Sequence, residues 1–382
     1  MKIMNSTALA TILAIGALTG AAHAEIRLGA SVSASGPAAF LGDPEAKTIE
    51  MMVDQINEAG GINGEEIALT LYDDGGDPNK ARTFATRLVE DDEVVAIIGG
   101  STTGTTMSIL DVAQDEGIPF ISLAGAISII DPVREYVFKT PHTDRMACEK
   151  IFTDMQGRGI SKVGMISGTD GFGASMQAQC KEVAGNHGIE IVADETYGPQ
   201  DADMTPQLTR IRNTAGVQAV LNPGFGQGPA IVTRNVAQLG FDIPLYQSHG
   251  VASNAFIELA GAEAAEGVHL PGTALLIGDL LAGDDPQYKV VTDYTTAYKA
   301  KYNQDPSTFA GYAHDAVALM ADAITRAGGG DDPDAIRDAL EETKGFVGTT
   351  GTYTFTPEDH LGLDLTAFRM LEITGGDWKQ LD

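Results

Sequence analysis

VVAIIGGSTTGTTMSILDVAQDEGIPFISLAGA, residues 94–126, has the pattern of two strands with a helix between them. Residues 94–98 are a short apolar run that ends at two glycines, which predicts a buried strand. A cluster of Ser and Thr hydroxyls follows, and because these residues cap helices, we expect a helix to begin among them. Residues 118–122 predict the next strand, and residues 123–126 form a second loop of small residues.

The hydroxyl-rich loop of this stretch is a candidate binding site. In open α/β sheets, ligands bind in the crevice beyond the carboxyl ends of the strands. Free N–H groups and hydroxyls at a helix start suit an anion such as a carboxylate. Thr102 and Thr103 are the candidates, although they can also be read as simple helix caps, and the stretch alone favours neither reading.

The same alternation of strand and helix extends over most of the chain. It predicts α/β architecture with doubly wound parallel sheets. The segment before the first long helix reads as a loop through Gly42, and the last part of the chain alternates in period 2, as antiparallel strands do. No flexible linker separates the two α/β parts, so we expect several short crossings that form a hinge.

The length, the net charge and the N-terminal residues limit the classes of protein to which this chain can belong. The chain has 382 residues, enough for two domains, and a formal net charge of -29, which argues against nucleic acid and anionic membranes as partners. Residues 1–24 have a positive start, an apolar run and an Ala-His-Ala end, so we expect a signal peptide and an exported, soluble chain from Glu25. No later apolar run is long enough to span a bilayer.

Metal, redox and catalytic chemistry find little support in the sequence. An exported protein can bridge Cys148 and Cys180, which lie in predicted helices flanking one strand, but the sequence leaves their pairing open. Two Cys without nearby paired His do not make a zinc site, so we expect no metal and no cofactor. The dinucleotide glycine pattern, the phosphate-loop Lys and the GxSxG elbow are missing, so we expect no enzyme.

Several motifs together resemble one family. The chain is similar to the periplasmic solute-binding proteins of the branched-chain amino acid (leucine/isoleucine/valine-binding) type, which capture ligands for ABC importers, over residues 25–382. The motifs that carry the resemblance are SGPAAFLGD (35–43), INEAGGINGEEIALTLYDDGGDP (56–78), IIGGSTTGTT (97–106), DEGIPFIS (115–122), DGFG (170–173) and AEGV (265–268).

The resemblance implies a type I fold: two α/β lobes joined by three crossings, with the ligand in the cleft between them. It implies capture by hinge closure, a location in the periplasm, and the membrane subunits of an importer as partners; we also expect a monomer. The implied lobe boundaries are residues 25–139 with 271–348 for lobe one, and 140–270 with 349–382 for lobe two.

The resemblance also implies which residues hold the ligand. Thr102 and Thr103 match the hydroxyls that hold the ligand carboxylate, and Phe40 and Leu41 occupy the loop that supplies an aromatic contact. The other implied ligand positions are Ala124, Gly125, Ala126, Phe172, Phe225, His249 and Tyr312.

Four of these residues depart from the family pattern and suggest the ligand. Ala126 replaces Thr or Ser, Phe172 and Phe225 stand where Tyr is frequent, and His249 stands where an acid pairs the ligand ammonium. Burying an unpaired cation costs several kcal/mol. We therefore expect a small carboxylate with an apolar, aromatic body and no ammonium, as in the aromatic-acid-binding branch, with His249 contacting a second polar group.

Three alternatives stay open at this point. A branched-chain or other apolar amino acid would need another acid to pair its ammonium. A sensory module that presents its ligand to a membrane receptor would have the same sequence features as a transport protein. A hydrolase or dehydrogenase could use the same architecture, although the catalytic groups are missing.

Overall fold

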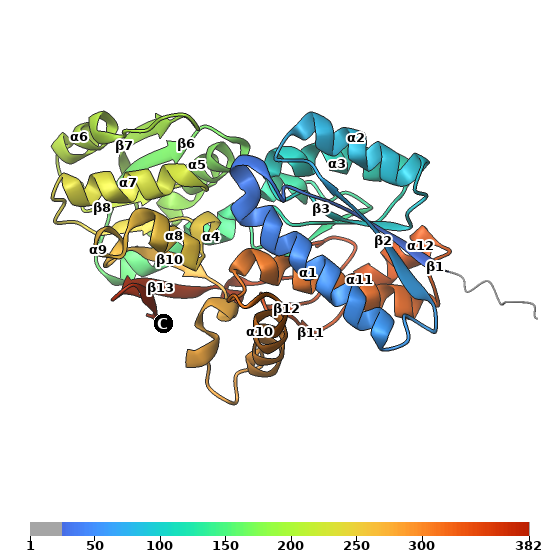
Figure 1. Ribbon diagram of the computed structural model, residues 1–382. Helices are drawn as coiled ribbons and strands as arrows, with labels where there is room; N and C mark the ends of the chain where they lie inside the picture. The colour runs from blue at the N-terminus through green and yellow to red at the C-terminus, as the bar shows by residue number, and fades with distance from the viewer. Residues whose placement is uncertain (1–24, 382) are drawn as a thin grey trace, which may run out of the picture.

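The computed structural model describes residues 25–381, so the expected signal peptide lies outside the described residues. Two α/β lobes lie next to each other (Figure 1). The first contains a parallel sheet in the order β2-β1-β3-β4-β5. Its elements are β1 (Glu25–Val32), α1 (Ala39–Glu58), β2 (Glu66–Asp73), α2 (Pro78–Glu90), β3 (Ala96–Gly99), α3 (Thr103–Glu116), β4 (Phe120–Ser122) and β5 (Val137–Lys139).

The second lobe contains a sheet in the order β14-β13-β10-β9-β8-β6-β7. Its β10-β9-β8-β6-β7 part is parallel, and β13 and β14 add to one edge as antiparallel strands. The doubly wound parallel architecture is therefore confirmed. The elements are α4 (Asp144–Gly157), β6 (Lys162–Gly168), α5 (Gly171–Val183), β7 (Glu190–Tyr197), α6 (Thr205–Asn213), β8 (Ala219–Asn222), α7 (Gln227–Gln238), β9 (Leu245–Gln247), α8 (Asn254–Ala260), α9 (Ala262–Ala265), β10 (His269–Gly272), β13 (Arg369–Thr374) and β14 (Asp377–Gln380).

After β10 the chain returns to the first lobe. Helix α11 packs along α1 there (Figure 1). Phe309 and Tyr312 of its first turns line the cavity described below. The elements of this return are η5 (Ala274–Leu280), α10 (Tyr288–Tyr302), α11 (Thr308–Ala327), α12 (Pro333–Glu341) and the short hairpin of β11 (Phe346–Val347) and β12 (Thr352–Tyr353).

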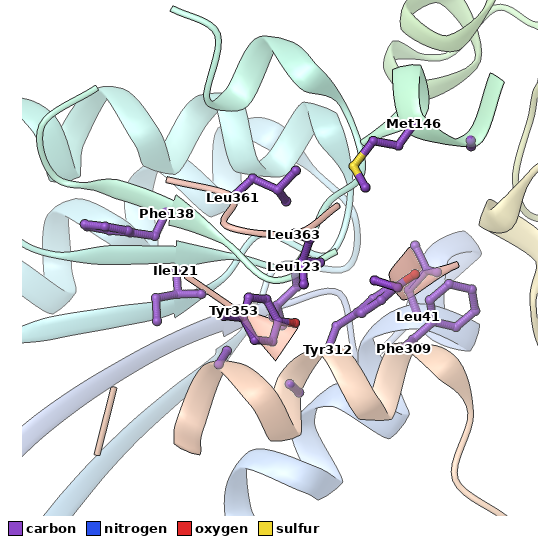
Figure 2. Packing of buried hydrophobic residues seen from close by; sticks show 14 of the residues in the cluster. Leu41, Ile121, Leu123, Phe138, Met146, Phe309, Tyr312, Tyr353, Leu361 and Leu363 are labelled. Atoms are coloured by element: carbon purple, nitrogen blue, oxygen red, sulfur yellow. The ribbon is translucent and has the colours of Figure 1, made fainter. Parts of the chain in front are cut away.

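The segment after the expected lobe boundary at residue 348 begins with residues that contact the first sheet. The backbone N–H of Lys139 donates to the His360 carbonyl at 3.2 Å, and the Phe138 and His360 rings stack with centroids 4.0 Å apart. Residues 353–363 thus pack on the end of the first sheet, around Phe138 (Figure 2). Period-2 alternation indicates a strand but not the sheet that it joins, so the lobe boundary after residue 348 stays a prediction.

The predicted loop through Gly42 is mostly helical. A short 3-10 turn, η1 (Gly36–Ala38), leads directly into α1, so Phe40 and Leu41 lie in the first turn of that helix. A Cβ on Gly42 would lie 2.2 Å from the backbone carbon of Ser33, so only glycine permits this approach of α1 to the end of β1.

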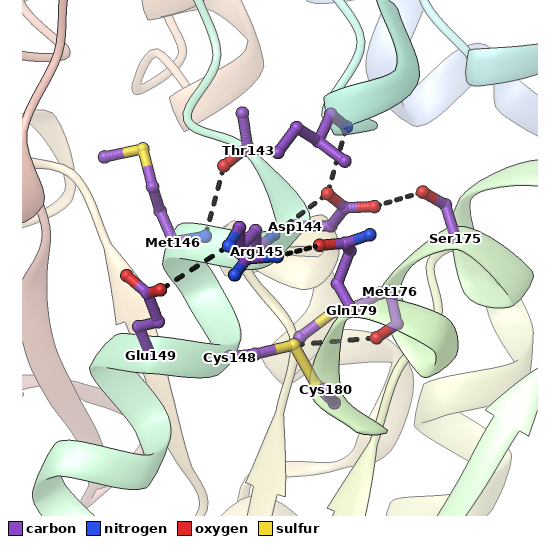
Figure 3. The surroundings of a disulfide bond; sticks show 11 residues. Thr143, Asp144, Arg145, Met146, Cys148, Glu149, Ser175, Met176, Gln179 and Cys180 are labelled. Atoms are coloured by element: carbon purple, nitrogen blue, oxygen red, sulfur yellow. Dashed lines mark hydrogen bonds and ion pairs between the residues drawn. A yellow bond between two sulfur atoms is a disulfide. The ribbon is translucent and has the colours of Figure 1, made fainter. Parts of the chain in front are cut away.

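The pairing of the two cysteines, which the sequence left open, is settled. Cys148 of α4 and Cys180 of α5 form a disulfide bond (Figure 3). Among residues 25–381, no helix combines the length and apolar character that a bilayer-spanning helix needs. Within the same range, no three His, Cys, Asp or Glu side chains are grouped to hold a metal.

Candidate functional site

The site lies where the sheet order of each lobe reverses. In the first sheet β1 and β3 are neighbours, and the loops after them meet because the Ser33 N–H donates to Ser101 Oγ at 2.9 Å. In the second sheet β6 and β8 are neighbours, and the Gly168 N–H donates to the Pro223 carbonyl at 2.9 Å. Such reversal points are where doubly wound sheets bind ligands.

These loops enclose a small cavity of about 40 Å³ between the lobes. The cavity is lined by Leu41, Ser101, Thr102, Thr103, Leu123, Ala124, Gly125, Pro141, Phe172, Phe225, His249, Gly250, Phe309 and Tyr312.

Most residues singled out from the sequence line this cavity, but Phe40 and Ala126 do not. Phe40 lies next to two lining residues, with the centroid of its ring 6.0 Å from that of Phe225 and 5.8 Å from that of Phe309. It thereby joins the lobes by an aromatic contact. Ala126 is fully buried beside the hinge, where its carbonyl accepts a 3.4 Å hydrogen bond from Lys139 Nζ.

Sequence reasoning missed five of the lining residues. The one with a clear signal is Phe309, which precedes Tyr312 by three residues and therefore shares its face of α11. The ring centroids of these two residues are 6.1 Å apart, and Figure 2 shows them near Leu41. The others missed are Ser101, Leu123, Pro141 and Gly250.

The two threonines at the start of α3 have different roles. Thr102 is the N-cap: its hydroxyl accepts a hydrogen bond from the Thr105 N–H. In turn, the Thr105 hydroxyl accepts one from the Thr102 N–H. Thr103 Oγ1 is buried and has no hydrogen-bond partner among the described residues. Thr102 therefore caps the helix, and of these two threonines Thr103 is the one whose hydroxyl has no partner among the described residues.

The loop after β4 offers no free hydrogen-bond donor at Ala124. The Ala124 N–H is already bound to Ser122 Oγ at 3.1 Å, so Ala124 lines the cavity with its methyl group. Gly125 lies against two side chains of the second lobe. A Cβ placed on it would lie 2.9 Å from both Phe172 Cε2 and His249 Nε2. The absent side chain at Gly125 is what lets the second lobe close to this distance.

The second lobe presents an apolar wall. The Phe172 ring meets Phe225 edge-on at 6.2 Å and His249 edge-on at 5.3 Å, an arrangement in which aromatic rings attract each other. Burial, and then the nearby Lys139, lower the pKa of His249 to about 3, so its ring is neutral near pH 7. Its Nδ1 has no partner among the described residues.

The polar groups of the cavity are neutral. Besides Thr103 and His249, the hydroxyl of Tyr312 is buried without a partner in the described part of the chain. Burial raises the pKa of Tyr312, so this hydroxyl keeps its proton and can donate. None of the residues that line the cavity carries an acidic or basic side chain that is charged near pH 7.

A second hollow adjoins the cavity. It measures about 780 Å³ and shares Thr102, Thr103, Phe172 and Phe225 with the inner cavity. Much of its remaining wall is glycine from loops of both lobes. The rings of Phe172 and Phe225 thus border both hollows.

Two α/β lobes that are joined by several crossings and closed over one internal cavity define a two-lobed ligand-binding protein. The chain belongs to the periplasmic binding protein family, whose model matches residues 25–377. The resemblance noted from the motifs is confirmed by relatives that are named Leu/Ile/Val-binding proteins.

Two relatives illustrate the similarity in sequence. The Leu/Ile/Val-binding protein homolog 3 of Brucella melitensis is 27% identical over 359 residues, which is 93% of each chain. The leucine-, isoleucine-, valine-, threonine-, and alanine-binding protein of Pseudomonas aeruginosa is 28% identical, over 90% of this chain and 89% of that protein.

Solved structures agree in fold. An extracellular ligand-binding receptor from Rhodopseudomonas palustris superimposes with a TM-score of 0.87 at 30% identity, covering 94% of this chain and 100% of the other. The branched-chain amino acid transporter substrate binding protein LivJ from Streptococcus pneumoniae, in complex with isoleucine, gives a TM-score of 0.81 at 26% identity, covering 94% and 99%.

Proposed function

We propose that this protein is the periplasmic substrate-binding component of an ABC importer and captures a small apolar carboxylate, with an aromatic body favoured. The membrane subunits of that importer would be its partners, and the protein would act as a monomer. The observation that carries the ligand class is the lining of the cavity, which combines aromatic rings, neutral polar groups and no charged side chain.

The carboxylate would lie at the start of α3. The first N–H groups of a helix have no partner within it and carry partial positive charge. Thr103 adds a buried hydroxyl at this place. A helix start with a hydroxyl can therefore hold an anion without a basic side chain.

The absence of an acidic side chain from the cavity lining argues against an ammonium group. At the position where family members place an acid, His249 is neutral and cannot pair a cation. Burial of an unpaired ammonium costs several kcal/mol. An amino acid would therefore bind less well than the same molecule without its amino group.

A branched-chain amino acid is the second candidate, because the relatives are named for leucine, isoleucine and valine. For this candidate an acid must pair the ammonium. The buried carboxyl of Glu45 is hydrogen-bonded to Ser101, which lines the cavity, but Glu45 itself does not line it.

Replacing Thr103 with valine tests the carboxylate site. The change keeps the shape of the side chain and removes one hydroxyl donor to a charged group. We expect roughly a 10- to 100-fold loss of carboxylate affinity, since such a bond contributes about 1.5–3 kcal/mol. Titration calorimetry measures it, and the matched control is Thr83→Val, on an exposed position of α2. Equal affinities of wild type and Thr103→Val would remove Thr103 from the site.

A further inference from the structure

Glu45 is a buried acid directly behind the cavity. It lies on α1 with no exposed surface, and its carboxyl is hydrogen-bonded to the hydroxyl of Ser101, which lines the cavity. Its second oxygen, Oε1, has no partner among the described residues. A carboxyl that is buried in this way needs an explanation, because an ionised one would be poorly solvated.

The groups around Glu45 favour its neutral form. Asp74 lies near it and is held by the hydroxyls of Ser31, at 3.1 Å, and Ser33, at 2.7 Å. On the α11 side Glu45 faces Tyr312, whose hydroxyl keeps its proton. Burial raises the pKa of Glu45 to about 8; the Ser101 hydrogen bond opposes this shift and the Asp74 charge adds to it. Near pH 7 the carboxyl therefore holds a proton.

That proton decides which way the Ser101 hydroxyl points. Ser101 Oγ already accepts a hydrogen bond from the Ser33 N–H. When Glu45 is neutral, its O–H can donate to the second lone pair of Ser101 Oγ, and the Ser101 proton is free to point into the cavity. When Glu45 is ionised, the Ser101 proton turns back to the carboxylate, and the cavity faces an oxygen lone pair.

We propose that neutral Glu45 sets the Ser101 hydroxyl as a hydrogen-bond donor to the ligand's carboxylate, so that ligand binding and retention of the Glu45 proton are coupled. The proposal rests on the proposed function, because it assumes an anionic ligand. Glu45 would act as a positioning residue through Ser101. Binding the anion stabilises the neutral form of Glu45, and ionisation of Glu45 weakens binding through both the lost donor and like-charge repulsion.

The test is the dissociation constant between pH 6.5 and 9.5, for whichever of 3-phenylpropanoate, 4-methylpentanoate and 3-methylbutanoate binds best. Each unit by which the anion raises the pKa of Glu45 weakens binding tenfold once Glu45 is ionised. We expect the wild-type constant to rise about tenfold from pH 7 to 9.5. In Glu45→Gln this ratio should fall below about twofold, because glutamine does not titrate.

Two comparisons separate Glu45 from other titrating groups. Glu50→Gln removes an exposed carboxylate from the same helix and should keep the wild-type pH profile. Lys139 is fully buried beside the hinge, and burial lowers its pKa to about 7 while Asp144 opposes this, so it also titrates in this range. If Glu45→Gln retains the pH dependence, the dependence belongs to Lys139 or another group and the proposal fails.

The remaining outcomes distinguish this proposal from the proposed function. A carboxylate that binds with the same affinity at every pH overturns the role of Glu45 and leaves the proposed function standing. Binding of leucine that tightens with pH and is lost in Glu45→Gln would show that Glu45 pairs an ammonium, and overturns both. Absence of binding by all three acids also overturns both.

A ligand-free measurement shows whether Glu45 holds its proton. Because the pKa of Glu45 is raised in the folded state, its contribution to stability is present below the unfolded-state value and is lost as pH rises through about 8. The melting temperature of Glu45→Gln should therefore exceed that of wild type by more at pH 9 than at pH 5. An equal difference at both pH values would contradict a neutral buried Glu45.

Discussion

Replacing Gly125 with valine should weaken ligand binding by roughly 10- to 100-fold with little change in the stability of the ligand-free protein. The reason is that the nearest atoms to a side chain at this position belong to the other lobe. A Cβ would lie 2.9 Å from Phe172 Cε2 and His249 Nε2, and 3.4 Å from Phe172 Cδ2. The added methyl groups would therefore oppose closure without disturbing the first lobe.

Calorimetry with the carboxylate that binds best to wild type measures this effect, and Gly125→Ala should give a smaller loss. Gly157→Val is the matched control, because nothing lies within 4 Å of a Cβ at that glycine. Small-angle X-ray scattering should show that Gly125→Val stays open in saturating ligand. A variant that binds as tightly as wild type would mean that the lobes need not approach as closely as Gly125 and Phe172 do here.

Removing the disulfide should lower the free energy of unfolding by about 3–4 kcal/mol. The double substitution Cys148→Ser and Cys180→Ser opens a link between residues that are 32 positions apart in sequence. In the loop-entropy account, the link stabilises the protein by restricting the unfolded chain, and the size of the effect follows from the loop length. Both cysteines are fully buried, so two buried serine hydroxyls add to the loss.

The disulfide also lies next to the joint between the lobes. Asp144, at the start of α4, accepts from the Ile127 N–H of the first lobe at 3.0 Å and from the Ser175 hydroxyl of α5 (Figure 3). Helix α5 carries Phe172 in the same N-terminal part as Ser175. We therefore expect weaker ligand binding as a smaller, secondary effect of the double substitution.

Unfolding in urea measures the loss of stability. Wild type unfolded in the presence of a thiol reductant is the control, and its midpoint should move toward that of the double variant. Because the sulfurs are buried, reduction of the disulfide should require unfolding first. The disulfide of the native protein should therefore be reduced more slowly than that of the unfolded protein. Equal urea midpoints of wild type and double variant would contradict a stabilising role for the bond.

Much of the fold could be predicted because its signals are local. Apolar runs that end at small or polar residues mark strands, and Ser or Thr at a helix start marks the cap, as Thr102 does. The loop after a predicted strand indicated Thr103, whereas Gly125 and His249 were predicted from the resemblance to the family; all three line the cavity. These residues lie at sheet edges that the order of elements alone brings together.

The parts that could not be predicted depend on packing between distant segments. Residues 353–363 pack on Phe138 of the first lobe, a choice that no local pattern records. Glu45 reads as a surface residue of an amphipathic helix, yet it is buried. One signal was present: Glu45 precedes the buried Ile49 and Val53 by four and eight residues, so it lies on the apolar face of α1.

The central claim is that the cavity takes a carboxylate without an ammonium, and matched ligand pairs test it most directly. Thermal unfolding of ligand-free protein would be followed with leucine and 4-methylpentanoate, valine and 3-methylbutanoate, and phenylalanine and 3-phenylpropanoate, which differ within each pair only in the amino group. A ligand at a thousand times its dissociation constant adds about 4 kcal/mol to native stability. We predict that at least one of the acids raises the melting temperature and that its amino acid partner leaves the melting temperature unchanged. A shift with leucine or valine and none with the acids would contradict the claim.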